Sequence, residues 1–350
     1  MKSSRIRLST NEKIGFVKNL HTMLSAGIPI LEVIDSLLED SKGGTKAVLL
    51  ALKEDLSQGK HMYYSFDKFP KIFDKVTVSI IKTAEESGTL DVALKDMTEN
   101  IKKDAEFRDK VKGAMLYPLV IMVVFIIVFF VLLVVVIPKI SEVFERLHVV
   151  LPLPTKILIF ISHLLLDYTI PFIIIVISLI VGVFIFYKMK REIFVKFLFA
   201  LPLISKLAVQ IDLTKFSRSM YLLLNAGITI NDSLTLCQEV VAKNSVKKTI
   251  IHAKETVLAG KKMSLAFKSH KSTIPVIMIK IIEAGEKSGT LDKSMQDISE
   301  YLDYQVSKTL KTVTTLMEPL MLVVVSVLIG GMMMAIIAPI YGLIGQVGNR

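Results

Sequence analysis

Residue types that often do chemistry are present in this chain, but their spacing favours none of the familiar sites. The six histidines are scattered without a His-x-x-x-His or Glu-x-x-His pair, and Cys237 is the lone cysteine. Gly59-Lys60 and Gly260-Lys261 suggest a phosphate loop, but glutamate replaces the loop's first glycine and no serine or threonine follows either lysine. We therefore predict no catalytic residue, no metal site, no cofactor and a protein that is not an enzyme.

Much of the sequence consists of two similar copies. Residues 16–40 match residues 216–240 at an offset of 200, and residues 80–101 match residues 281–302 at an offset of 201. The same offset extends into two apolar stretches, each flanked by prolines. A period near 200 residues indicates a duplicated domain rather than a solenoid of short repeats. The repeated unit is predicted to be a polar helical module followed by a membrane-spanning helix.

Two glutamates occupy equivalent positions just before a Ser-Gly turn in the two copies. Each is either a solvated carboxylate or turn partner, or part of a conformational joint that relays motion between helices. The candidate joint comprises Glu85, Ser87, Gly88, Glu286, Ser288 and Gly289. Glycine can end a helix in the left-handed conformation, so other glycines at expected helix ends are predicted to be structural turns. They are Gly27, Gly59, Gly227 and Gly260.

The polar parts of both copies have helical periodicity. Apolar residues recur at spacing i, i+4, i+7 and i+11, at Leu90, Leu94, Met97 and Ile101 and again at Leu291, Met295, Ile298 and Leu302. No turn-bounded stretch has the period of two that is typical of a strand. Each half is predicted to be a helical bundle of roughly 100 residues, enough for its own core. The thiol of Cys237 is expected to be buried there.

Three long stretches contain no charged residue, although 21% of the chain is charged and its mean hydropathy is +0.56. They are 114–137, 168–187 and 319–349. Each reaches the roughly 20 residues that a helix needs to cross a bilayer, and this length argues against buried helices of a soluble core. We predict an all-α polytopic membrane protein with three transmembrane helices and two homologous cytoplasmic helical bundles.

Lysine and arginine predict the orientation of these segments. They number 19 in residues 1–113 and 20 in residues 188–318, but three in residues 138–156. Cytoplasmic segments carry the excess of positive charge, so both polar halves and the N-terminus are expected in the cytoplasm and the C-terminus outside. The predicted order is bundle 1 (1–113), span 1 (114–137), an extracytoplasmic loop and approach to span 2 (138–167), span 2 (168–187), bundle 2 (188–318), span 3 (319–341) and an extracytoplasmic tail (342–350).

Two other classes of protein fit the composition less well. A formal net charge of +11 could indicate nucleic-acid binding, but the basic residues are interspersed with acidic ones and no aromatic platform accompanies them. A small-solute transporter subunit would need polar groups at mid-membrane depth, and the first apolar stretch has nothing to hold an ion. We expect a membrane protein without a nucleic-acid partner.

The duplicated motifs resemble the type II secretion F and type IV pilus platform family (GspF, PilC). The family's L-x-x-G-I and G-E-x-S-G-x-L motifs correspond here to Leu24–Ile28, Leu224–Ile228, Ala84–Leu90 and Gly285–Leu291. Tyr117-Pro118 and Glu318-Pro319 stand where that family begins its first and last spans. Family members often carry an extension before the first bundle, which here begins by about Asn11.

The resemblance implies a multi-pass platform in the bacterial inner membrane. Such proteins work above a cytoplasmic hexameric assembly ATPase and pass pilin or pseudopilin from the bilayer into a growing fibre. They self-associate and act with other inner-membrane alignment proteins. The candidate joint at Glu85 and Glu286 would then relay motion of the ATPase. The rival expectation is a static scaffold that recruits the other components.

Residues in and near the last span are candidate contacts. The candidate membrane-proximal set is Tyr117, Pro118, Glu318 and Pro319. Glu318 either caps a helix start or faces a protein interior and pairs with a cation on a pilin or a second protomer. Small residues four apart allow close helix approach, through packing within the chain, self-association or pilin contact. They are Ser326, Gly330, Gly331, Ala335, Ala338 and Gly342.

Overall fold

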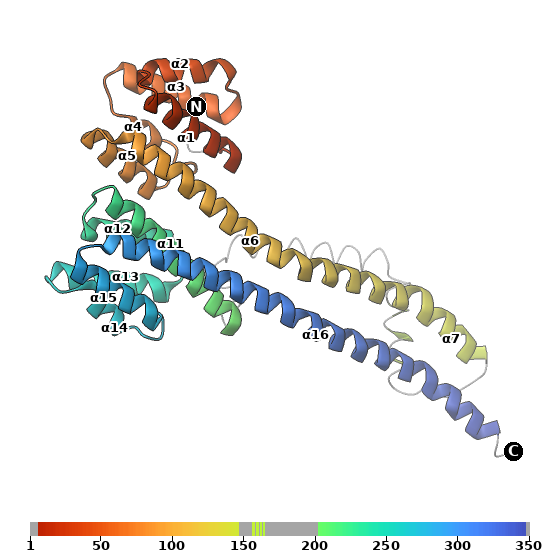
Figure 1. Ribbon diagram of the computed structural model, residues 1–350. Helices are drawn as coiled ribbons and strands as arrows, with labels where there is room; N and C mark the ends of the chain where they lie inside the picture. Colours follow the sequence, from red (N-terminus) through yellow and green to blue (C-terminus); the bar gives the residue numbers. More distant parts are fainter. Residues whose placement is uncertain are drawn as a thin grey trace. The chain divides into compact units, whose positions relative to one another are not determined.

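All regular structure in the described part of the chain is helical (Figure 1). The computed structural model describes residues 6–146, 156, 157, 159, 160, 162, 164 and 202–347. Within these residues the predicted all-α class is confirmed, whereas the predicted second span at 168–187 lies outside them. The chain divides into two compact units, one of residues 1–111 and 206–308 and the other of residues 112–205 and 309–350.

The first copy begins with five helices that enclose a hydrophobic core. They are α1 (Thr10–Ser25), α2 (Ile30–Asp40), α3 (Gly43–Ser57), α4 (Met62–Asp67) and α5 (Lys75–Ser87). A capping box starts α1, because Ser9 and Glu12 each accept a hydrogen bond from the other's backbone N–H. Leu20 and Leu94, which the helical spacing placed on a core face, are fully buried. The rings of Phe66 and Phe73 stack in this core, with centroids 4.2 Å apart.

The second copy repeats this order of helices. It contains α11 (Pro202–Asn225), α12 (Ile230–Val240), α13 (Asn244–Leu258), α14 (Met263–Lys268) and α15 (Val276–Ser288), followed by the long helix α16 (Leu291–Val347). Met220, Met295 and Ile298 are fully buried, as the helical spacing predicted. The thiol of Cys237 is buried as expected, and burial raises its pKa.

The core of the second copy includes side chains from the first copy. Val76, Ile80 and Ala84 of α5 and Ala93 of α6 (Leu90–Val131) belong to the same buried cluster as the helices of the second copy. Leu90 packs against the cores of both copies. The two copies are therefore packed against one another as one compact unit.

Two long helices contain apolar stretches that are candidate membrane spans. After α6 the chain continues through a π-helical turn, η2 (Leu132–Val136), into α7 (Ile137–Arg146). By length and composition, Leu90–Lys139 and Leu291–Gly331 could each cross a bilayer. Only 11% and 0% of the residues in their most apolar windows are buried, unlike the core helix of a soluble protein.

Proline breaks the hydrogen-bond pattern of α6, and a threonine hydroxyl replaces the lost donor. Pro118 has no N–H for the carbonyl of Ala114, four residues earlier. The hydroxyl of Thr314, on α16, lies 3.4 Å from that carbonyl and 3.0 Å from the carbonyl of Leu310 in its own helix. The hydroxyl carries one proton, which it can donate to either of these two carbonyls.

A serine does the same at the second proline of this helix. In η2 the N–H of Ile137 donates to the carbonyl of Leu132, five residues earlier. The same pattern would pair the carbonyl of Leu133 with residue 138, which is proline and has no N–H. The hydroxyl of Ser162 donates to the Leu133 carbonyl instead (2.7 Å).

Candidate functional site

The equivalent glutamates Glu85 and Glu286 cap two short helices. Glu85 lies near the end of α5, and its carboxylate accepts hydrogen bonds from the N–H groups of Met62 (2.8 Å) and Tyr63 (3.4 Å) at the start of α4. Glu286, near the end of α15, accepts one from Ser264 of α14 (3.3 Å). A carboxylate there satisfies free N–H groups and complements the helix dipole. The bonds join residues 22 to 23 apart in sequence, and no local motif indicated them.

The turn after each glutamate has the same contacts in both copies. Gly88 (φ +70°) and Gly289 (φ +72°) end α5 and α15 in the left-handed conformation, which glycine adopts without strain. Serine and threonine hydroxyls bridge each turn, Ser87 to Thr89 (2.8 Å) and Ser288 to Thr290 (2.7 Å). Because α6 and α16 begin directly after these turns, the glutamate and the turn connect a short helix to a long one.

The other four predicted turn glycines also have positive φ. The values are +80° at Gly27, +73° at Gly59, +81° at Gly227 and +73° at Gly260. A Cβ built at any of these positions meets no atom within 4 Å. What these positions require is therefore a backbone conformation rather than space.

A buried polar cluster in the first copy escaped the sequence analysis. The carboxylate of Asp55 is 1% exposed and accepts hydrogen bonds from Ser65 (2.6 Å), Lys68 (2.5 Å) and Lys60 (3.3 Å). Burial opposes its ionisation, but these bonds outweigh burial and lower the pKa of Asp55 to about 2. Asp55 lies three residues after Leu52 in α3, so both are on one face of the helix, and this spacing could have indicated that Asp55 is buried. In the second copy only Lys60 has a matching residue, Lys261; the carboxylate, the serine and the other lysine are replaced by Thr256, Ala266 and Ser269.

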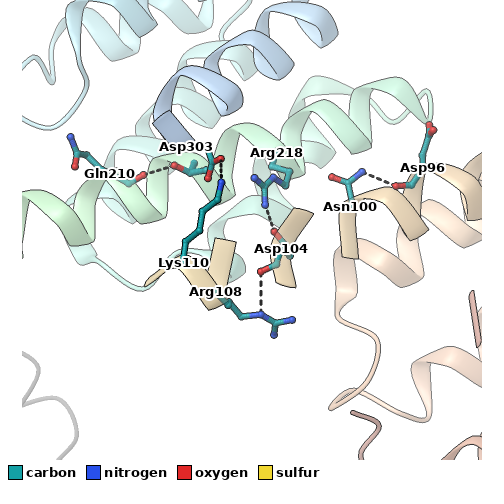
Figure 2. A network of polar contacts seen from close by, with 9 residues as sticks. Asp96, Asn100, Asp104, Arg108, Lys110, Gln210, Arg218 and Asp303 are labelled. Atoms are coloured by element: carbon teal, nitrogen blue, oxygen red, sulfur yellow. Dashed lines mark hydrogen bonds and ion pairs between the residues drawn. The ribbon is translucent and has the colours of Figure 1, made fainter. Parts of the chain in front are cut away.

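Polar side chains from α6 meet α11 and α16 between the two copies (Figure 2). Polar pairs between the copies include Lys75–Glu239 (2.7 Å), Asn225–Asp96 (2.8 Å), Lys110–Asp303 (3.4 Å), Lys103–Glu300 (3.8 Å) and Arg218–Asp104. Burial, followed by the charge of Glu99, raises the pKa of Asp96. None of these residues was among the candidates from sequence, because each pair is brought together only by the packing of the copies.

Arg218 is the nearly buried member of this network. Its side chain is 10% exposed, whereas that of its partner Asp104 is 54% exposed. The guanidinium also lies 5.8 Å from the centre of the Phe107 ring, on the same helix as Asp104. A cleft of about 280 Å³ beside it is lined by both acidic and basic residues, among them Glu99 and Lys103. Because its charges are mixed, the cleft selects no single class of charged ligand.

No cluster of histidine, cysteine and carboxylate residues in the described part of the chain could hold a metal ion. The arrangement at the glutamates, the glycine turns and the polar network instead holds helices to one another. Its contacts are hydrogen bonds and ion pairs between elements.

The proline motifs near the spans do not start helices, which corrects one expectation. Helix α6 runs through Tyr117 and Pro118, and α16 runs through Glu318 and Pro319, without a break. Glu318 therefore does not cap a helix start, because the helix is already formed before it. Among the residues that the structure describes, nothing covers Tyr117, Glu318 and Pro319, which are exposed.

The small residues of the last predicted span all lie on α16. Ser326, Gly330 and Gly331 are exposed, and their small size would allow another helix to approach α16 closely there. The environments of Ala335, Ala338 and Gly342 lie outside the described part of the chain.

The chain matches a known protein family in both copies. The sequence model of the family described as type II secretion system (T2SS), protein F, matches residues 16–138 and again residues 216–339. These two ranges fall on the two copies recognised from the sequence. The chain belongs to this family.

Relatives of the chain carry two kinds of name. The type IV pilus assembly protein PilC of Thermus thermophilus is 26% identical over 94% of this chain and 82% of the relative. PilC of Pseudomonas aeruginosa is 26% identical over 95% and 89%. The type II secretion system protein F of Vibrio cholerae is 25% identical over 95% and 82%. Family membership and the two candidate spans point to an inner-membrane protein.

Proposed function

We propose that this chain is the inner-membrane platform of a type IV pilus or type II secretion machine. It couples a cytoplasmic hexameric assembly ATPase to the insertion of pilin or pseudopilin subunits into a fibre. The family match over both copies carries this proposal, because relatives with the same span of sequence are named for pilus assembly and for type II secretion. In this scheme the ATPase partner supplies the energy, and the chain itself carries out no enzymatic step.

The proposed topology places both polar halves, residues 1–113 and 188–318, in the cytoplasm. Spans at 114–137, 168–187 and 319–341 anchor them, with the loop 138–167 and the tail 342–350 outside. The concentration of lysine and arginine in the two halves supports this orientation. Both halves are then on the side where an ATPase acts.

The long helices offer a route for movement. Helix α6 has 42 residues and would be about 63 Å long at 1.5 Å per residue. Like α16, it begins among the polar helices and continues into a candidate span. Bending such a helix sharply needs a break in its hydrogen bonds, and α6 is helical throughout, with the hydroxyl of Thr314 beside the carbonyl that Pro118 leaves without a backbone donor. A displacement of the polar end would therefore be carried into the membrane.

The proposed joint is the equivalent pair of glutamate turns. Glu85 holds the start of α4, and the turn at Ser87 and Gly88 leads directly to α6. Glu286, Ser288 and Gly289 make the same connection from α14 to α16 in the second copy. A force on the short helix would thus reach the long helix through one carboxylate and one tight turn.

The joint is tested by replacing each glutamate in a strain that depends on this chain for fibres. Glu85→Ala and Glu286→Ala remove both acceptor oxygens, whereas Glu85→Gln keeps one and should retain part of the activity. Glu86→Gln is the matched control, because Glu86 is exposed and contacts only Lys82 at 4.0 Å. We expect the alanine variants to reduce fibre number at least several-fold while the protein level and co-purification with the ATPase stay at the control level.

The other outcomes are decisive as well. Normal fibre number in both alanine variants would exclude the joint. Loss of ATPase co-purification together with fibres would favour a static scaffold, in which the glutamates serve only recruitment. Absence of any association with an ATPase in the unsubstituted chain would overturn the proposed function itself.

Residues near the first and last spans, together with small residues within the last, are the proposed contacts for pilin or for a second protomer. They are Tyr117, Pro118, Glu318, Pro319 and the small residues Ser326, Gly330, Gly331, Ala335, Ala338 and Gly342. Cysteines introduced at Ser326 and Gly330 should crosslink to pilin in membranes. Products confined to a single chain would instead assign this surface to packing within the chain.

A further inference from the structure

The two copies use the same faces in different ways. Val76, on the face of α5 that packs into the second copy, is 5% exposed, whereas its equivalent Ile277 on α15 is 42% exposed. On the opposite side, Leu222 of α11 packs against the shared core, whereas its equivalent Thr22 of α1 is exposed. The contact between the copies is therefore one-sided: the α5–α6 face of copy one meets the α11–α12 face of copy two.

One-sided packing leaves two faces without a partner among the residues that the structure describes. The first is the α15–α16 face, equivalent to α5–α6. The second is the α1–α2 face, equivalent to α11–α12. Within the chain, the filled contact is marked by three polar pairs, Lys75–Glu239 (2.7 Å), Asn225–Asp96 (2.8 Å) and Arg218–Asp104. The repeat offset identifies which residues would form the same pairs between two chains.

We propose that the α15–α16 face of one chain binds the α1–α2 face of a second copy, repeating the contact already made within the chain. A heterologous contact of this kind leaves a free face at each end, so it builds a ring or an open row rather than a closed two-fold dimer. The proposal concerns self-association alone and stands or falls independently of coupling to an ATPase.

The chemistry of the equivalent residues is compatible with this contact. At the proposed contact, Ser25 stands in the place of Asn225 and Asp297 in the place of Asp96. A serine hydroxyl can donate a hydrogen bond to a carboxylate, as the amide of asparagine does. Lys18 stands in the place of Arg218, and Gln305 stands in the place of Asp104. The amide oxygen of Gln305 can accept a hydrogen bond from the ammonium group of Lys18. Ser25, Asp297 and Lys18 are exposed in the chain, and Gln305 is partly exposed.

Charge complementarity supports the same pairing. Helix α2 presents Glu39, which is equivalent to Glu239, as well as Glu32 and Asp40 on its exposed surface. Val276, the first residue of α15, stands where α5 has Lys75, the partner of Glu239. Lys280 follows Val276 by one helical turn and is exposed, so a positive charge lies close to the place that Lys75 occupies.

The proposal is tested by crosslinking the full-length chain in membranes. Glu39→Cys and Val276→Cys are made in two differently tagged chains, and a short bis-maleimide is added. Native Cys237 can remain, because it is buried and burial suppresses thiolate formation. Lys75→Cys with Glu239→Cys in one chain is the matched control and should give an intrachain product.

We expect the mixed pair of chains to crosslink at least several-fold more than either chain with itself. A chain carrying both cysteines should give a ladder of multimers. Equal yields for like and mixed pairs, or no mixed product where the intrachain control reacts, would overturn the proposal. Val276→Lys should strengthen association by about 2- to 5-fold by restoring the ion pair, and Val276→Glu should weaken it.

Discussion

Charged residues within the packed unit are satisfied by partners that lie far away in the sequence, and the exposure of each partner sets the cost of losing it. Arg218 is 10% exposed and Asp104 is 54% exposed, although they form one pair. Removing the exposed carboxylate leaves a nearly buried cation without its partner. Removing the cation leaves an exposed carboxylate that water can solvate.

We therefore predict unequal effects for the two halves of this pair. Asp104→Asn should destabilise the chain by roughly 1–3 kcal/mol, whereas Arg218→Met, which keeps the packing against Phe107, should cost less than about 1 kcal/mol. Thermal unfolding of the purified chain in detergent measures both. Equal losses of stability in the two variants would contradict the argument that the nearly buried cation is the costlier partner to leave unpaired.

Asp55 gives a prediction about pH. Its pKa is about 2 in the folded chain, against an ordinary value of 3.8. A lowered pKa means that its stabilising effect is complete above pH 4 and declines as the pH falls toward 2, because protonation breaks the bonds to Lys68 and Lys60. Asp55→Asn should remove this part of the pH dependence and cost roughly 1–3 kcal/mol at neutral pH.

The second copy supplies the control for this prediction. Thr256 stands at the position equivalent to Asp55, and its hydroxyl bonds only to the carbonyl of His252 in the same helix (2.8 Å). Thr256→Ala should change the unfolding temperature little and leave the acid limb of the stability curve as it is. A similar shift for both variants would contradict a special role for Asp55.

At the scale of elements, the long helices depend on hydroxyl groups that replace donors lost to proline. We predict that Thr314→Val destabilises the packing of α6 against α16 by about 0.5–1 kcal/mol, the usual net value of one neutral hydrogen bond. Pro118→Ala restores an N–H to the carbonyl of Ala114, so Thr314→Val should cost less in that background. The double-mutant cycle is measured by unfolding in mixed micelles.

The serine at the second proline gives an independent check. Ser162→Ala should behave like Thr314→Val, and Pro138→Ala should reduce its cost. If both cycles are additive, the hydroxyls are incidental and the helices tolerate their prolines in another way.

At the scale of the whole molecule, the proposed mechanism requires both polar halves on the cytoplasmic side. We predict that Leu50→Cys and Leu258→Cys, at residues that are 50% and 63% exposed, react with a membrane-impermeant maleimide only after spheroplasts are lysed. Glu142→Cys, in the loop expected outside, should react before lysis. Labelling of Leu258→Cys in intact spheroplasts would refute the topology. It would also exclude an ATPase that binds both polar halves from the cytoplasm.

Much of the fold could be predicted from the sequence because it is local. Helical periodicity correctly indicated the buried faces at Leu94 and Met295, and the duplication indicated two equivalent sets of helices. The family resemblance followed from short motifs around the glycine turns and is confirmed by the family match. The reading of Glu318 as a helix cap failed because local sequence cannot show that a helix has already begun upstream.

The helical class, the repeat and the apolar stretches could be predicted from the residues alone, because apolar periodicity, glycines at helix ends and long uncharged runs act over a few turns of chain. The helix that Glu85 caps, the carboxylate that is buried with lysines, and the entry of α5 of one copy into the core of the other became known from the folded chain. Contacts between the copies join residues that are far apart in the sequence, 164 positions for Lys75 and Glu239 and 193 for Lys110 and Asp303. Their energy depends on packing that no short stretch of sequence specifies.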